Sequence, residues 1–279
     1  MLKYSIIFAG SNNYVLEYLA HRNDISVEYC FFHGESGDLA KIISCCKDYG
    51  LKYAVVKKNK QILEILKVLP SIKIGICSSF IILDEKVYNW PEKGFINIHP
   101  SYLPSYKGAN PFYYMLMNNE KEGGVTVHEI TNVVDGGDIL AQARYPVSLE
   151  DDISMLIEKA NKLSTVLLEN NLDGIIHGAV KKNKNTGGGH YPPVTSRQWI
   201  NLSMLPMQIY NLVRSQTIYG GCLLKRNEKE FIVEGVILNY HGRDSITIGT
   251  IDKSYLQDVL VDGDIKIILF SREHNSWNM

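Results

Sequence analysis

The chain has 279 residues, of which 45% are hydrophobic and 21% are charged, a composition that is typical of a globular protein and excludes intrinsic disorder. Because 29 Lys and Arg residues face 30 Asp and Glu residues, the net charge of −1 gives no general attraction to nucleic acid or to an anionic membrane. The five cysteines have no CxxC spacing, which favours reduced thiols over disulfides or a zinc site. No apolar run approaches the roughly 18 residues of a membrane span, so we expect a cytoplasmic protein without a membrane partner.

Strand-like and helix-like segments alternate over the first hundred residues. Short apolar runs predict strands at residues 5–9, 25–32, 53–56, 72–77 and 95–98. Helix-like patterns lie between them, after Asn12 or Asn13, at residues 39–49 and at residues 61–69. This alternation predicts an α/β fold with a Rossmann-like, mostly parallel sheet that is covered by helices on both faces.

The pattern changes after residue 100. A loop over residues 99–108 precedes a helix through Met117, two strands at 124–130 and 139–147, and a long amphipathic helix that begins after Asp151 or Asp152.

A basic, glycine- and proline-containing stretch, residues 181–196, is interpreted as a solvated linker. Beyond it, a helix at 206–215 and strands at 222–224, 231–238, 245–248 and 265–270 predict a small, β-rich, barrel-like domain. The expected domains are therefore residues 1–196, which end in the linker, and residues 197–279.

Polar side chains gather at the end of the last strand of the predicted parallel sheet. Asn97 and His99 are two positions apart, so they project from the same face of that strand. The carboxyl edge of the strands is where ligands bind in open α/β sheets. Taken alone, the pair also has a plain structural interpretation, in which Asn97 completes a turn and His99 makes a hydrogen bond in the core.

A second polar cluster lies in residues 132–139, which contain Asp135, two glycines and Asp138. These residue types are also typical of a hairpin turn, because glycine accepts a positive φ and aspartate stabilises turns. In combination with Asn97 and His99, the cluster indicates a functional site.

The sequence from Gly94 to Pro111, continued by Gly124-Val-Thr126 and Asp135-Gly-Gly-Asp-Ile139, closely resembles the folate-dependent formyltransferases. The resemblance covers residues 3–147 with specific motifs and the rest of the chain more loosely. It is strongest toward the nucleotide-sugar N-formyltransferases, which are related to methionyl-tRNA formyltransferase. It implies transfer of a formyl group from N10-formyltetrahydrofolate, as co-substrate, to a primary amine, without a metal ion.

The resemblance assigns the catalytic set of the family to Asn97, His99 and Asp135, and the chemistry of these side chains agrees. An amine that attacks a formyl carbon creates a negative oxygen and a positive nitrogen. Asn97 can donate to the oxygen, His99 can take the amine proton and pass it to the folate nitrogen, and Asp135 can orient the imidazole. We interpret His128 as structural or substrate-facing and not as a metal ligand.

In the family, the segment before the Asn97 strand leads into a loop whose backbone holds the pterin. Here that segment, residues 74–84, departs from the family pattern, because relatives usually have a small or polar residue near Phe80 and a proline at the place of Asp84. The resemblance implies that four side chains neighbour the cofactor, although plain core packing is an equal alternative: Phe80, Ile81, Leu83 and Asp138.

The C-terminal part bears on the acceptor. Residues 199–214, followed by Gly220 and Gly221, resemble the linker helix and barrel entry of the tRNA and nucleotide-sugar branches. A tRNA enzyme needs a basic groove for phosphates, but residues 197–279 contain nine Lys or Arg and nine Asp or Glu. This neutrality favours a small dTDP- or UDP-linked amino-deoxy sugar, for surface polysaccharide or O-antigen synthesis (lipopolysaccharide biosynthesis), with no nucleic-acid partner.

Such a substrate needs one or two cations for its diphosphate and an aromatic ring for its base. The candidates for these contacts are Tyr102, Lys107, Tyr191, Arg197, Arg214 and Tyr219. Each of them could instead serve only in packing or in solvation of the surface. By analogy with the related sugar enzymes, a homodimer is compatible with this interpretation.

Three alternatives remain. Methionyl-tRNA formyltransferase uses the same chemistry on a different acceptor. A dehydrogenase is disfavoured, because only Gly10 follows the first strand and the G-x-G-x-x-G pattern is absent. A noncatalytic binding protein that evolved from such an enzyme would keep the fold without needing His99.

Overall fold

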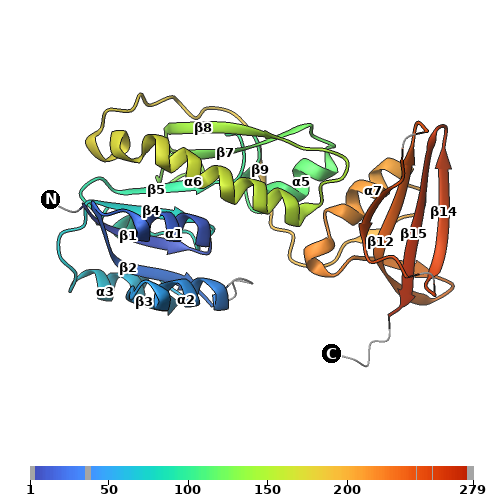
Figure 1. Cartoon of the computed structure of the whole chain (residues 1–279), viewed down its shortest axis with the longest axis horizontal. Helices are drawn as coiled ribbons and strands as arrows, with labels where there is room; N and C mark the ends of the chain where they lie inside the picture. Colours follow the sequence, from blue (N-terminus) through green and yellow to red (C-terminus); the bar gives the residue numbers. More distant parts are fainter. Residues whose placement is uncertain (1–3, 35–38, 243, 253, 275–279) are drawn as a thin grey trace. The chain divides into compact units, whose positions relative to one another are not determined.

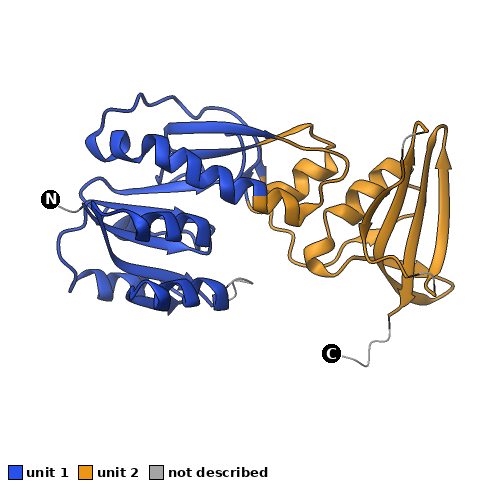
Figure 2. Ribbon diagram, viewed as in Figure 1, with its two compact units in different colours: residues 1–108, 124–145, 159–190 blue, residues 109–123, 146–158, 191–279 orange. Residues whose placement is uncertain are grey.

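The computed structural model describes residues 4–34, 39–242, 244–252 and 254–274 (Figure 1). The chain forms two compact units (Figure 2). The first unit comprises residues 1–108, 124–145 and 159–190, and the second comprises residues 109–123, 146–158 and 191–279. Each unit draws on several stretches of the chain, and the expected single boundary between residues 196 and 197 stays a prediction.

The first unit is built on a seven-stranded sheet with the order β3-β2-β1-β4-β5-β7-β8. Its parallel strands are β1 (Tyr4–Gly10), β2 (Ile25–His33), β3 (Tyr53–Val56), β4 (Ile74–Ser78) and β5 (Phe95–His99). Strand β7 (Glu122–Glu129) runs antiparallel to β5, and β8 (Ile139–Pro146) is its neighbour at the sheet edge. The predicted α/β fold with a mostly parallel sheet is thereby confirmed.

Helices pack against both faces of this sheet (Figure 1). On one face, α1 (Asn13–His21) and α2 (Leu39–Asp48) contact each other and β2. On the other, α3 (Asn59–Leu66) and α4 (Glu85–Tyr88) contact each other and share a core with Ile7 of β1. The side chains of β1 alternate between these faces, because successive residues of a strand point to opposite sides.

Side-chain interactions fix two helices, α1 through a cap and α6 through an ion pair. Asn12 begins α1, where its side-chain oxygen accepts the Val15 N–H at 3.2 Å. The long helix α6 runs from Ile153 to His177, and Asp173 in its last turns pairs with Arg22 at 2.7 Å, directly after α1. The predicted amphipathic helix after Asp152 is therefore present.

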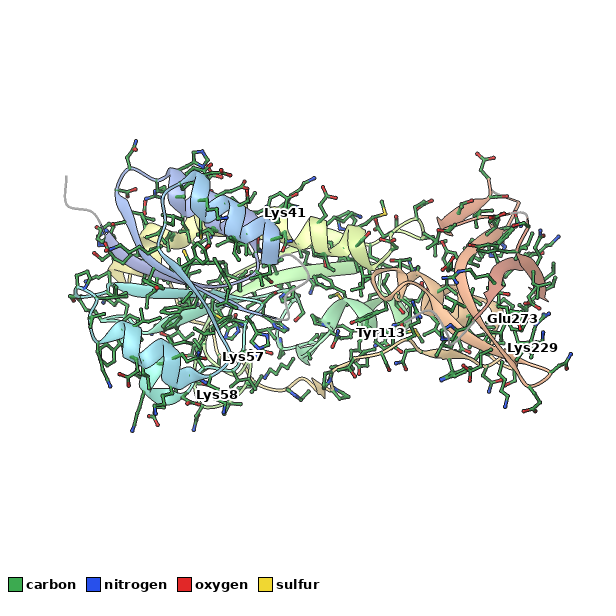
Figure 3. The ribbon with its side chains drawn as sticks, turned by 90° about the horizontal axis from the view of Figure 1, so that it is seen from below. Lys41, Lys57, Lys58, Tyr113, Lys229 and Glu273 are labelled. Carbon is green, nitrogen blue, oxygen red and sulfur yellow. The ribbon has the colours of Figure 1, made fainter. Side chains whose placement is uncertain are left out.

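The second unit holds a six-stranded sheet with the order β10-β11-β12-β15-β14, and β13 pairs with β12. The strands are β10 (Trp199–Ile200), β11 (Cys222–Arg226), β12 (Lys229–Tyr240), β13 (Ile246–Gly249), β14 (Leu256–Asp262) and β15 (Ile265–Glu273). At one end of the antiparallel β12–β15 pair, Lys229 Nζ lies 3.0 Å from Glu273 Oε1 (Figure 3). The C-terminal part is thus β-rich, as predicted.

Helix α7 (Pro206–Arg214) packs on this sheet and contributes Ile209 and Val213 to its core. The remaining elements of the chain are short: β6 (Lys107–Gly108), α5 (Pro111–Met117), β9 (His190–Tyr191) and the 3₁₀ helix η1 (Thr217–Tyr219). No helix among the described residues is long and apolar enough to cross a membrane.

Strand β14 was not predicted, because its polarity pattern is the reverse of that of an ordinary half-buried strand. Asp258 points inward and is 7% exposed, whereas Val259 and Val261 are 56% and 64% exposed. A pattern that expects apolar residues on the buried face therefore misses this strand.

Candidate active site

The site begins at the C-terminal end of β5. Asn97 and His99 lie on the same face of this strand, as the two-residue spacing predicts. The antiparallel register with β7 places Asn97 opposite His128 and His99 opposite Thr126. Two strands therefore bring polar side chains to one edge of the sheet.

Asp135 reaches the same place from the loop between β7 and β8. Its backbone is in the left-handed region, with φ of 48°, which aspartate tolerates better than most residues. Gly137 lets the loop approach β7 closely, since a Cβ at this position would lie 1.8 Å from the Glu129 carbonyl oxygen. The geometry of the loop thus requires glycine at position 137 and suits aspartate at position 135.

The carboxylate of Asp135 lies beside the imidazole of His99, with 3.5 Å between Oδ2 and Nδ1. The other ring nitrogen, Nε2, lies 2.8 Å from the Tyr106 carbonyl oxygen. A carbonyl oxygen only accepts, so Nε2 carries the proton of the neutral ring and the lone pair is on Nδ1. The nitrogen that can accept a proton is therefore the one that faces Asp135.

The other carboxylate oxygen contacts a second pair of side chains. Oδ1 of Asp135 lies 3.4 Å from Asn97 Nδ2 and 3.5 Å from His128 Nε2. Asn97 Nδ2 also lies 3.1 Å from His128 Nε2, while His128 Nδ1 lies 2.8 Å from the Glu129 carbonyl oxygen. His128 Nδ1 therefore donates to the Glu129 carbonyl, and Nε2 faces both Asn97 and Asp135.

Burial and charge set the protonation of these groups. Burial alone would raise the pKa of Asp135, but the imidazoles of His128 and His99 and the Gly108 N–H, 2.8 Å from Oδ2, outweigh it and lower the pKa to about 2. Burial lowers the pKa of His99 below its ordinary value, and the charge of Asp135 partly offsets this shift. The site thus combines an ionised carboxylate with a neutral, proton-accepting imidazole.

The loop after His99 is fixed by hydrogen bonds around Thr126. The Thr126 hydroxyl donates to the Ser101 carbonyl at 2.7 Å and accepts the Leu103 N–H at 3.0 Å. Gln142 Nε2 donates to the Leu103 carbonyl at 2.7 Å and to the Thr126 hydroxyl at 2.9 Å. This network positions the backbone that leads to Tyr106 and Gly108, the two main-chain partners of the site.

The sequence of residues 31–171 matches the profile of the formyl transferase family. The methionyl-tRNA formyltransferase of Caldicellulosiruptor saccharolyticus is 30% identical over 236 residues, which cover 79% of this chain and 75% of that protein. The chain belongs to the formyl transferase family. A second methionyl-tRNA formyltransferase, from Caldanaerobacter subterraneus, is 31% identical over 60% of this chain and 55% of its own length.

Solved formyltransferase structures have the same fold. The sugar 3N-formyl transferase WlaRD, in the presence of dTDP and 5-N-formyl-THF, superimposes with a TM-score of 0.70 at 21% identity over 97% of this chain and 98% of its own. The N-formyltransferase from Helicobacter canadensis, in complex with folinic acid and dTDP-3-aminofucose, gives a TM-score of 0.70 at 21% identity over 98% of this chain and all of its own. At these identities the likeness concerns the fold.

The four predicted cofactor neighbours of this formyltransferase differ in their surroundings. Phe80 and Ile81 are partly buried and pack on the core of the first unit, whereas Leu83 belongs to that core and is 6% exposed. Asp138 pairs with Lys184 at 2.9 Å and its side chain is 25% exposed. Phe80, Ile81 and Asp138 keep exposed surface, whereas Leu83 lies in the core against which Phe80 and Ile81 pack.

Two predicted substrate residues lie in the first unit. The guanidinium of Arg144 stacks over the Tyr102 ring in a cation–π contact, with Cζ 3.8 Å from the ring centroid. Lys107 Nζ donates to the carbonyl oxygens of Gly187 at 2.9 Å and Asn185 at 3.4 Å. The predicted contact of Lys107 with a substrate would have to compete with these two bonds.

Three other candidates lie in the second unit. The Tyr219 hydroxyl donates to the Val194 carbonyl at 3.1 Å and accepts from Asn110 Nδ2 at 2.9 Å. Arg197 Nε donates to the Tyr219 carbonyl at 2.8 Å. The Tyr191 ring lies 4.5 Å from the ring of Tyr114. Arg197 and Tyr219 are thus neighbours, and Tyr191 belongs to an aromatic pair.

The environment of Arg214 argues against its predicted contact with a diphosphate. Its side chain is 1% exposed, and NH1 donates to the carbonyl oxygens of Ser148, Asp151 and Leu149 at 2.8, 3.1 and 3.4 Å. Nε donates to Asn211 at 2.9 Å. Arg214 therefore ties α7 to the segment before α6, and we propose that its role is structural.

The interpretation of the basic run 181–184 as a solvated linker is incomplete. Lys182 Nζ lies 2.5 Å from Glu129 Oε1, and the main chain of Asn183 exchanges hydrogen bonds with Ile139 at 2.8 and 2.9 Å. With the Lys184–Asp138 ion pair, these contacts dock the run on the loops that carry the site.

Sequence reasoning missed two contributors to the site. His128, predicted to be structural or substrate-facing, was not placed in the catalytic set, and it contacts both Asn97 and Asp135. His128 lies opposite Asn97 because β5 and β7 pair in an antiparallel register. The alternating pattern of residues 124–130 predicts a strand but does not specify this register. Asn185, which contacts the Asp135 loop, carries no local signal. Among the described residues, no group of three or more His, Cys, Asp or Glu is arranged to hold a metal ion.

Proposed function

We propose that this formyltransferase moves the formyl group of N10-formyltetrahydrofolate to the primary amine of a nucleotide-linked, dTDP- or UDP-type, amino-deoxy sugar. The observation that carries the reaction is the meeting of Asn97, His99 and Asp135 at one edge of the sheet. Their donor, base and carboxylate are the groups that an attack of an amine on a formyl carbon requires.

Asn97 stabilises the charge that develops on the formyl oxygen. Its Nδ2 lies 3.1 Å from His128 Nε2 and donates to Asp135 Oδ1 at the longer distance of 3.4 Å. The N–H group in the longer, weaker contact is the one that can most readily turn to donate a hydrogen bond to the formyl oxygen. Removal of one donor of this kind typically costs about 2.7–4 kcal/mol of transition-state stabilisation.

His99 accepts the proton of the attacking amine and returns it to the departing folate nitrogen. Nδ1 is the accepting atom, because Nε2 is bonded to the Tyr106 carbonyl at 2.8 Å. General acid–base catalysis by one positioned side chain contributes roughly 10²–10⁴-fold to a rate.

Asp135 stabilises the imidazolium that forms on His99 and fixes the ring beside the reacting groups. The carboxylate oxygen Oδ2 lies 3.5 Å from Nδ1, and the N–H of Gly108 holds the same oxygen at 2.8 Å. With a pKa of about 2, Asp135 is ionised wherever His99 is neutral, so its charge is present when the proton arrives.

The residues present fit a formyl-folate co-substrate. Phe80 and Ile81 offer apolar surface at the end of β4, and Asp138 offers a carboxylate that is 25% exposed and follows the catalytic Asp135 loop. We propose these three as neighbours of the folate, with Leu83 in the core against which Phe80 and Ile81 pack. The folate-bound neighbours of this fold, WlaRD and the Helicobacter canadensis enzyme, favour the same co-substrate.

Two observations support a nucleotide sugar as the acceptor. Residues 197–279 are electrically neutral, which is unsuited to a long polyphosphate ligand such as tRNA. Two structural neighbours were solved with dTDP or dTDP-3-aminofucose. We propose that five residues help to bind this substrate: Tyr102, Lys107, Tyr191, Arg197 and Tyr219. We also propose that the product is used in surface polysaccharide synthesis.

A second candidate function, formylation of methionyl-tRNA, is favoured by one observation. The chain is 30% identical to a methionyl-tRNA formyltransferase over 236 residues. The two candidates share the site and the co-substrate and differ only in the acceptor. A tRNA acceptor predicts binding that weakens steeply with salt, because phosphate contacts release counterions.

The deciding experiment incubates the protein with N10-formyltetrahydrofolate and either a panel of dTDP- and UDP-linked amino sugars or methionyl-tRNA, with mass spectrometry of the products. We expect an N-formylated nucleotide sugar and a rate that depends weakly on salt. Formylated methionyl-tRNA alone would establish the second candidate instead. No formylated product with either acceptor would refute both.

A further inference from the structure

Asp135 has a left-handed backbone conformation, which an aspartate tolerates but does not adopt by preference. Its φ of 48° is left-handed, and Gly137 of the same loop lies so close to β7 that no side chain fits there. Such conformations persist where the surroundings impose them. Only two main-chain bonds are internal to this region, Gly136 N–H to the Val133 carbonyl and Glu129 N–H to the Asp138 carbonyl, both at 3.0 Å, among the described contacts of the loop.

Asn185 supplies the additional constraint from a distant part of the chain. Its Nδ2 donates to the Asp135 carbonyl at 2.7 Å and to the Gly137 carbonyl at 3.1 Å. The two protons of one amide group thus bind two carbonyls that flank Gly136. This bridge fixes the main-chain course of the loop on both sides of its turn.

The chemistry of Asn185 points to this bridge as the reason for an amide at the position. The residue is 7% exposed, and its Oδ1 is buried with no hydrogen-bond partner among the described residues. A buried acceptor without a partner is unfavourable, so a side chain that merely filled space would be better apolar. An amide is therefore useful at this position because its Nδ2 donates two hydrogen bonds to the Asp135 loop.

Asn185 itself is anchored next to the site. The main chain of Asn183 pairs with Ile139 at the far end of the Asp135 loop, and Lys107 Nζ donates to the Asn185 carbonyl at 3.4 Å. Lys107 precedes Gly108, whose N–H holds Oδ2 of Asp135 at 2.8 Å. The loop of Asp135 and the loop of His99 are thus both tied to the segment that carries Asn185.

We propose that Asn185 is a positioning residue, whose amide bridge between the Asp135 and Gly137 carbonyls holds the Asp135 carboxylate against His99. This inference rests on the proposed function for its catalytic consequence, but not for its geometric one. Without the bridge, the loop gains freedom and the carboxylate spends less time 3.5 Å from Nδ1. A displacement of about 1 Å in a catalytic group can cost roughly 100-fold in rate.

The structural consequence has a spectroscopic signature. The titratable groups that face His99 are Asp135, which raises the pKa of the imidazole, and His128, which lowers it. Weaker contact with Asp135 therefore moves the pKa of His99 further down. A substitution that only loosened the fold would leave this pKa unchanged in the molecules that remain folded.

The test compares Asn185→Ala and Asn185→Gln with the matched control Asn183→Ala. Asn183 is exposed, and its described hydrogen bonds, both with Ile139, come from its main chain, so its truncation keeps them. The first measurement is the titration of His99 by NMR in each folded protein, which needs no substrate. The second is kcat and KM for formyl transfer.

We expect Asn185→Ala to lower the pKa of His99 and to lower kcat about 10–100-fold, with KM within about twofold of the original protein. Asn185→Gln keeps the amide donor and should retain more of kcat than the alanine variant, and Asn183→Ala should match the original protein. An unchanged His99 titration in folded Asn185→Ala would overturn the proposal, as would equal losses in Asn183→Ala. If the original protein transfers no formyl group, the proposed function fails, and the titration alone still decides the role of Asn185.

Discussion

Oδ2 of Asp135 lies 3.5 Å from Nδ1 of His99, although His99 ends strand β5 and Asp135 lies in the loop between β7 and β8. Because the Tyr106 carbonyl occupies Nε2, the carboxylate acts on the one ring nitrogen with an available lone pair. Burial lowers the pKa of His99, and the charge of Asp135 counteracts it. This pair therefore sets the protonation on which the proposed proton transfer depends.

Replacement of Asp135 by asparagine should lower kcat by about 10²–10⁴-fold, because the imidazolium loses its counter-charge while the shape of the site is kept. The pKa of His99 should fall in the same variant, since Asp135 raises it. Steady-state kinetics and NMR titration of His99 measure the two effects.

Asp173→Asn is a suitable control for that substitution, because Asp173 pairs with Arg22 and its side chain is 63% exposed. We expect kcat of this control to stay within about twofold of the original value, since exposed ion pairs contribute little. An Asp135→Asn variant as active as the Asp173→Asn control would show that the carboxylate is not part of the chemistry.

The stability of the protein should fall in acid partly through Asp135. A carboxyl group with a pKa near 3.9 when unfolded and about 2 when folded contributes roughly 2–3 kcal/mol at neutral pH. The folded state favours the ionised form, so this contribution is present above the unfolded pKa and is lost as the pH falls toward the folded pKa. Urea unfolding at a series of pH values between about 5 and 2 measures it.

In Asp135→Asn this acid-dependent part should vanish, so its free energy of unfolding should fall less over the same pH range. His99 acts at higher pH: its pKa is lowered on folding, so stability is lost as the pH falls below about 6.5, the ordinary pKa of histidine. Parallel stability curves for the two proteins between about pH 5 and 2 would show that Asp135 is not held as an ionised group.

Arg214→Met should destabilise the second unit by about 2–4 kcal/mol, because buried carbonyl oxygens of Ser148 and Asp151 lose their charged donor. The KM for the nucleotide sugar, measured well below the unfolding temperature, should stay nearly unchanged. Thermal unfolding and steady-state kinetics provide the two numbers.

Arg272→Met serves as the comparison, since Arg272 pairs with Glu234 at 2.7 Å and its side chain is 46% exposed. That substitution should cost less than about 1 kcal/mol. If Arg214→Met raised KM strongly and left the unfolding temperature unchanged, Arg214 would bind substrate, and its structural assignment would be wrong.

The parts of the fold and site that were predictable follow from local periodicity. The alternation of apolar strands and helices indicates the parallel sheet, and the two-residue spacing places Asn97 and His99 on one face. The pairing of Asp135 with His99 rested on the family resemblance, because no local pattern specifies where the loop after β7 returns.

The parts that were missed depend on long-range geometry. His128 meets Asn97 through a strand register, and Asn185 reaches Asp135 with one side chain from a stretch whose composition is that of a linker. Asp258 faces inward in β14, against the usual polarity of a strand. Arg214 is buried, whereas a basic residue near the end of a helix is ordinarily expected to be exposed.

The most direct test of this account is a double-mutant cycle on formyl transfer from N10-formyltetrahydrofolate, with the original protein, His99→Gln, Asp135→Asn and the double variant. Residues that act as one unit give strongly non-additive losses, so the double variant should be no more than about threefold slower than the slower single variant. Losses of kcat that simply multiply would contradict the claim that the imidazole and the carboxylate serve the same proton transfer.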